Sequence, residues 1–203
     1  MPSDCSATLS GVKTEERRKA RKLRAEGWSV KEIERHLGVA RSSVSIWVRD
    51  IRRAYQQEGR RLVYERGASY AAGCMLYWAE GTKDRNCIRI SNSDPALLAF
   101  FASFLREHFD VPDDRFRLHC HLFADHLERQ RQIERFWLTT LGLPETCLRK
   151  SSVNTYSKYS QKKRVNKLPY GTCQLGVYIS RVVQTIYGSI QEYGGFDRPE
   201  WLD

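Results

Sequence analysis

The 203-residue sequence lacks the features of a membrane or secreted protein. No segment approaches the roughly 18 consecutive apolar residues of a membrane-spanning helix, and the polar N-terminus has no signal-peptide core. We therefore expect a cytoplasmic protein without a membrane partner. The length leaves room for one ordinary domain and a smaller one.

Paired cysteines are also lacking. The six cysteines lie far apart and form no Cys-x-x-Cys pair, so we expect reduced thiols and no disulfide framework. The segment His119-Cys120-His121 has metal-ligand residue types. On a strand, however, the two histidines face one side and Cys120 the other, and no second ligand pair lies nearby. This pattern favours a polar strand over a zinc site.

Acidic residues are outnumbered by basic ones. The chain has 34 Lys or Arg against 24 Asp or Glu, a net charge of +10, which favours a polyanionic partner. The excess lies in two zones. Residues 1–68 hold 16 basic and nine acidic side chains, and residues 149–168 hold seven basic side chains and no acid.

Residues 13–51 have the apolar spacing of three short helices. A first helix fits residues 14–25, and a capping box formed by Ser29 and Glu32 begins the second. Gly38 ends the second helix, and the third begins near Arg41. A glycine turn between the second and third helices is typical of a helix-turn-helix.

This segment resembles the homeodomain-like helix-turn-helix modules of bacterial regulators, transposases and resolvases. With Val44, Trp47, Val48 and Ile51 facing inward, five polar residues of the third helix face outward, where they can contact a DNA major groove. They are Arg41, Ser42, Ser43, Ser45 and Arg49. The alternative is a helix pair used only for protein contact.

Residues 70–83 contain an unbroken apolar run, which predicts a buried helix. The run begins with small residues and ends at Glu80-Gly81, where glycine can end a helix. Residues 75–81 resemble the second part of the LAGLIDADG motif of homing endonucleases and of the regulators that look derived from them. The resemblance covers residues 70–192 and implies that Glu80 is the acid that holds magnesium. The alternative is an ordinary core helix in which Glu80 begins a turn.

The rest of the chain alternates strands with helices. Strands fit residues 87–91, 116–123, 146–153 and 172–179, and helices fit residues 97–108, 126–141 and 181–193. This order predicts an α+β protein with a three-helix helix-turn-helix, followed by a LAGLIDADG-like domain of helices on one side of an antiparallel sheet. The free side of that sheet would be open to DNA.

The second basic zone predicts a further DNA contact. Its basic residues are interleaved with tyrosines and amides, a mixture suited to phosphates and base edges. They are Lys158, Lys162, Lys163, Arg164 and Lys167. The alternatives are an ordinary solvated loop and, because of the tyrosines, a tyrosine recombinase. No constellation of activating arginine and histidine accompanies the tyrosines.

The predicted organisation is a disordered leader (1–11), a helix-turn-helix domain (12–52), a linker helix (53–68), a LAGLIDADG-like domain (69–194) and a tail (195–203). We expect a sequence-specific protein that binds double-stranded DNA and regulates transcription, as a homodimer joined through residues 70–79. The alternative function is a homodimeric homing-type endonuclease in which each Glu80 contributes to a magnesium site.

Overall fold

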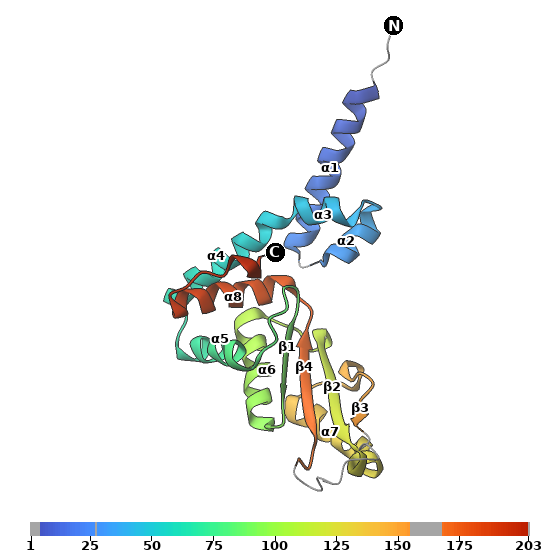
Figure 1. Cartoon of the computed structure of the whole chain (residues 1–203), viewed down its shortest axis with the longest axis vertical. Helices are drawn as coiled ribbons and strands as arrows, with labels where there is room; N and C mark the ends of the chain where they lie inside the picture. Colours follow the sequence, from blue (N-terminus) through green and yellow to red (C-terminus); the bar gives the residue numbers. More distant parts are fainter. Residues whose placement is uncertain (1–4, 27, 155–167, 203) are drawn as a thin grey trace. The chain divides into compact units, whose positions relative to one another are not determined.

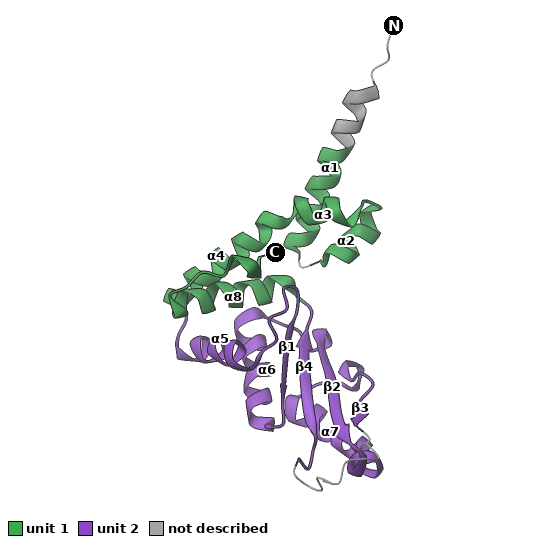
Figure 2. Cartoon of the chain, in the orientation of Figure 1, with its two compact units in different colours: residues 1–65, 179–203 green, residues 66–178 purple. Residues whose placement is uncertain are grey.

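The computed structural model describes residues 5–26, 28–154 and 168–202, and the side chains from residue 13 onward within these ranges. The chain forms two compact units (Figure 2). Unit 1 joins residues 1–65 to residues 179–203, and unit 2 comprises residues 66–178. The predicted α+β class is confirmed.

The first three helices of unit 1 have the predicted helix-turn-helix order (Figure 1). They are α1 (Cys5–Ala25), α2 (Val30–Leu37) and α3 (Arg41–Trp47), so α1 includes much of the expected leader. Ser29 and Glu32 form the predicted capping box, and Gly38 ends α2 in the left-handed conformation (φ 66°). A core of Ala20, Ile33, Val44 and Val48 holds the three helices together.

Unit 1 continues with a helix pair that differs from the expected organisation. Helix α4 (Arg49–Glu65) packs along α8 (Ser180–Gly194), so it is not an isolated linker. Helix α8, expected to close the second domain, belongs to unit 1. The crossing is close because Gly59 faces the backbone of Thr185 and Gly188 faces that of Gln56. Contacts through glycines and buried polar side chains leave no apolar periodicity in the sequence. The sequence pattern therefore did not predict that α4 and α8 pair.

The C-terminal segment folds back onto this helix pair. It contains a short 3₁₀ turn, η4 (Pro199–Trp201). The Arg52 side chain donates a hydrogen bond to the carbonyl oxygen of Leu202 (2.7 Å), and Gln184 donates one to that of Trp201 (3.1 Å). The Trp201 ring lies 4.5 Å from that of Tyr187. The expected tail is therefore part of the folded unit through Leu202.

The described residues of unit 2 form a four-stranded sheet and three α-helices, which Figure 1 shows packed together. The sheet order is β1-β4-β2-β3. The strands are β1 (Ile88–Asn92), β2 (Phe116–Phe123), β3 (Ser152–Asn154) and β4 (Thr172–Val177). The helices are α5 (Ala68–Glu80), α6 (Pro95–Phe109) and α7 (Gln130–Leu141), with 3₁₀ turns η1 (Asp113–Arg115), η2 (Ala124–Arg129) and η3 (Glu145–Cys147).

The sheet is antiparallel except at one edge. Strand β4 pairs antiparallel with β1 and β2, as predicted, whereas β3 runs parallel to β2. The chain reaches β3 through α7, and a crossover of this kind joins parallel strands. The expected strand at 146–153 is also shorter, because η3 takes up its first residues.

The apolar face of the sheet forms the core of unit 2. Ile88, Ile90, Leu118 and Leu175 are at most 1% exposed. Five cysteines with described side chains (Cys74, Cys87, Cys120, Cys147 and Cys173) are buried free thiols. No helix in the described part of the chain is long and apolar enough to cross a membrane.

Candidate nucleic-acid interface

The outer face of α3 presents most of the residues predicted to contact DNA. Arg41, Ser42 and Ser45 of α3 are exposed, and Ser43 is half-buried. Arg49, predicted to lie on the third helix, is exposed at the start of α4, because α3 ends at Trp47. The structure adds Ile46, which is 65% exposed while Val44 and Val48 beside it are buried. Sequence reasoning missed Ile46 because it followed only the polar residues, although helical spacing from Ser42 places it on the same face.

The two arginines of this face have different surroundings. The Arg41 side chain forms an ion pair with Glu34 of α2 (2.9 Å), which offsets part of its charge. Arg49 forms no ion pair with any residue that the structure describes. With Ser45, Val48, Arg52 and Leu202, it lines a hollow of about 340 Å³. Arg49 is therefore the more available cation for an anionic partner.

A basic residue of α1 holds the module together. The Arg21 guanidinium donates two hydrogen bonds to the Asp50 carboxylate (2.5 and 2.7 Å) and one to the carbonyl oxygen of Trp47 (2.9 Å). The hydrogen bonds with Asp50 raise the pKa of Arg21 and lower the pKa of Asp50. Arg21 thus fixes α1 against the end of α3.

The second face of the sheet in unit 2 is polar. Strand register aligns its residues in three rows across β1, β4, β2 and β3. The rows are Arg89-Gly176-Arg117, Ser91-Gln174-His119 and Thr172-His121-Ser152. Apart from Gly176, these residues have side chains that can donate or accept hydrogen bonds, so the face is suited to a polar partner such as the edges of bases.

The two histidines of this face share one hydroxyl. His119 Nε2 lies 3.1 Å, and His121 Nδ1 2.9 Å, from the Ser152 Oγ. Partial burial, followed by the neighbouring His119, lowers the pKa of His121. Cys120 faces the opposite, buried side of the strand, as alternation predicts.

Glu80 lies exposed at the C-terminal end of α5. Its Oε2 is 3.5 Å from the side-chain amide nitrogen (Nδ2) of Asn92. The cation at this helix end is Lys83, which donates hydrogen bonds to the carbonyl oxygens of Trp78 and Gly81 (both 2.7 Å). Such capping stabilises a helix C-terminus. Among the described residues, no group of three or more metal-ligating side chains surrounds Glu80 or lies elsewhere.

The predicted basic residues of the second zone, Lys158, Lys162, Lys163, Arg164 and Lys167, lie outside the described residues. Its described members, Arg149 and Lys150, are exposed.

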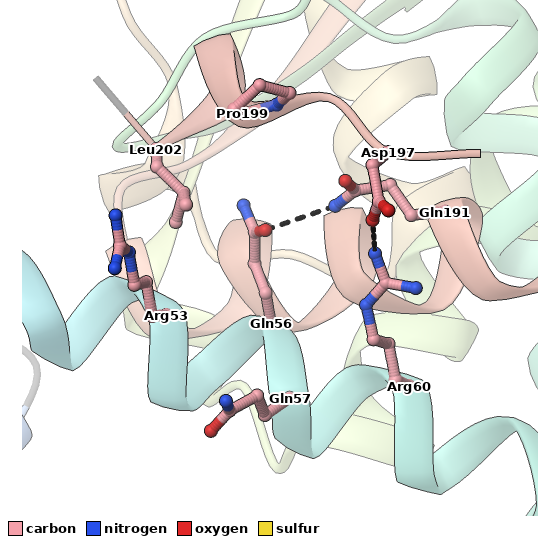
Figure 3. A pocket seen from close by; sticks show the side chains of 8 residues that line it. All are labelled: Arg53, Gln56, Gln57, Arg60, Gln191, Asp197, Pro199 and Leu202. Carbon is pink, nitrogen blue, oxygen red and sulfur yellow. Dashed lines mark hydrogen bonds and ion pairs between the residues drawn. The ribbon is translucent and has the colours of Figure 1, made fainter.

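A separate pocket of about 270 Å³ lies between α4 and the C-terminal segment (Figure 3). The Gln191 amide donates a hydrogen bond to Gln56 (3.1 Å), and Arg60 pairs with Asp197. Arg60 also pairs with Glu192 of α8 (3.0 Å). The polar side chains that line this pocket are thus bonded mainly to one another. Their contacts hold the C-terminal segment against α4.

Residues 15–60 match a protein-family model described as "Putative ATPase subunit of terminase (gpP-like)". The match runs from α1 into α4 and supports a DNA-binding region of the helix-turn-helix type there. It covers less than a quarter of the chain and does not extend to unit 2. No curated protein and no solved structure matches the chain. The sequence contains no Gly-Lys dipeptide and hence no phosphate-binding loop of the G-x-x-x-x-G-K-[ST] type.

Proposed function

We propose that this chain is a sequence-specific protein that binds double-stranded DNA and acts as a transcriptional regulator. The observation that carries the proposal is the surface formed by the outer face of α3 and the start of α4, where Ser42, Ser45 and Arg49 stand exposed on a packed three-helix core. An α-helix fits the major groove of B-form DNA, and an arginine can donate two hydrogen bonds to guanine. The net charge of +10 favours the same partner.

Unit 2 supplies the second contact surface in this proposal. Its resemblance to LAGLIDADG domains implies that the open face of the sheet lies against DNA. The polar rows that include Arg117, His119 and Gln174 support this role, because they offer donors and acceptors on the side away from the core. The lysines of residues 158–167 would add phosphate contacts.

We further propose that the protein is a homodimer joined through α5. One side of this helix is occupied within the chain, because Gly73 faces the ring of Phe104 on α6. Another side is open: Ala79 is exposed, and the Trp78 side chain is 40% exposed. Pairing of two such sides would cover apolar surface that one chain leaves in water.

The test is selection of binding sites from a library of random-sequence duplex DNA, followed by affinity measurements on the enriched site. We expect the full-length chain to enrich one sequence motif. Arg49→Ala should then weaken binding by about 1–3 kcal/mol and relax the preference at one position. Arg61→Ala is the matched control, because it removes an exposed positive charge from α4. Enrichment of no motif would refute the proposal.

The endonuclease alternative is tested on the same enriched DNA. Two Glu80 carboxylates brought together in a dimer would be needed, because the sequence contains one LAGLIDADG-like helix. Site-specific breaks that require magnesium and disappear in Glu80→Gln would support the nuclease. Intact DNA bound by the parent protein would favour the regulator.

A further inference from the structure

Ile46 is an exposed aliphatic side chain on an otherwise polar and basic surface. It is 65% exposed, whereas Val44 and Val48 are 0% and 2% exposed. It contributes little to the core cluster of the three helices, which consists of Ala20, Ile33, Val44 and Val48. Removing an isoleucine exposed to this degree from water would stabilise a complex with the partner that covers it.

The neighbours of Ile46 indicate what that partner is. Helical spacing places Ser42, Ser45 and Ile46 on one stripe of α3, and Arg49 follows just beyond its end. Ser42, Ser45 and Arg49 are all exposed. A protein partner that covered Ile46 would also have to cover these polar groups, whereas the DNA major groove supplies hydrogen-bond partners for them.

Only one base edge offers Ile46 an apolar contact. In the major groove, thymine alone carries an apolar group, its C5 methyl, next to the donors and acceptors of the bases. We propose that Ile46 is a specificity-determining residue that contacts a thymine methyl group in the target DNA. This inference rests on the proposed DNA-binding function and extends it to the composition of the site, which should contain a thymine whose methyl group Ile46 contacts.

The test replaces each thymine of the selected duplex, one at a time, with deoxyuridine. Deoxyuridine keeps the O4 acceptor and the base pairing and lacks the methyl group. Fluorescence anisotropy then gives the affinity of each duplex for the full-length chain. We expect one or two replacements to weaken binding about fourfold, the effect of removing one methyl-sized apolar contact.

Ile46 variants link this effect to the side chain. Ile46→Ala should bind the thymine duplex about as weakly as the parent binds the deoxyuridine duplex, and should not distinguish the two. Ile46→Val should keep an intermediate preference. Leu127→Ala, which also truncates an exposed aliphatic side chain (52% exposed), should distinguish them as the parent does. Because residue 46 is exposed, circular dichroism should show the parental fold for its variants.

The outcomes separate this inference from the function on which it rests. If the parent selects a motif but binds every deoxyuridine duplex as it binds the thymine duplex, the role of Ile46 is refuted and DNA recognition stands. The same holds if Ile46→Ala retains the parental preference. If no motif is selected at all, the DNA-binding proposal fails and this inference fails with it.

Discussion

Gly188→Ala should strongly destabilise unit 1, because the added methyl group has no room where α8 crosses α4. A Cβ at residue 188 would lie 2.0 Å from the carbonyl oxygen of Gln56 and 2.6 Å from its carbonyl carbon. These are backbone atoms, so no side-chain rotation relieves the overlap. Helices α4 and α8 would have to move apart by about 1 Å, in an interior packed too densely to absorb the change.

The magnitude follows from the contacts that this movement disturbs. Overpacking a core costs about 1–3 kcal/mol. The separation also weakens buried hydrogen bonds between the helices, from Gln56 to Gln184 (2.8 Å) and from Ser189 to the carbonyl oxygen of Gly59 (2.8 Å). Leaving a buried polar group unsatisfied costs about 1–3 kcal/mol. We therefore expect the free energy of unfolding to fall by about 2–6 kcal/mol, the sum of the two contributions.

Urea unfolding followed by circular dichroism measures the loss, and hydrogen exchange of the α8 amides localises it. Gly67→Ala is the control, because a Cβ there meets no atom within 4 Å. It should change stability by less than about 1 kcal/mol. A Gly188→Ala protein within about 1 kcal/mol of the parent, with unchanged exchange in α8, would refute the close crossing of α4 and α8.

Three further outcomes are expected. Ser29→Ala removes the cap of α2 and should lower the unfolding free energy by about 1 kcal/mol; an unchanged thermal midpoint would contradict the capping box. Deleting residues 196–203 removes the hydrogen bonds from Arg52 and Gln184 to the C-terminal segment. Hydrogen exchange in α4 should then become faster. Exchange as slow as in the parent would show that the C-terminal segment does not stabilise α4. Because the pKa of His121 is lowered in the folded chain, the unfolded chain binds more protons below about pH 6.5, and stability should fall as the pH drops through that range. His121→Asn should reduce this slope in urea unfolding at pH 7.5 and 5.5, and an equal slope in both proteins would count against the assignment.

Local signals in the sequence determined the helix-turn-helix and the α+β class. The Ser29 capping box, the turn at Gly38 and the inward spacing of Val44 and Val48 each act within one or two helical turns, so they can be read without knowledge of distant contacts. The same spacing placed Arg41, Ser42, Ser45 and Arg49 on the surface.

Tertiary structure alone decided which segments pair. Helix α4 finds its partner in α8, more than a hundred residues later, through Gly59, Gly188 and buried glutamines. Gly73 lies in the segment (residues 70–79) that was expected to join two chains, and it receives Phe104 of its own chain. The exposure of Ile46 likewise depends on what the other helices cover. Close contacts between backbones and buried amide pairs leave no periodic apolar pattern, because their stability comes from shape and hydrogen bonding between distant segments.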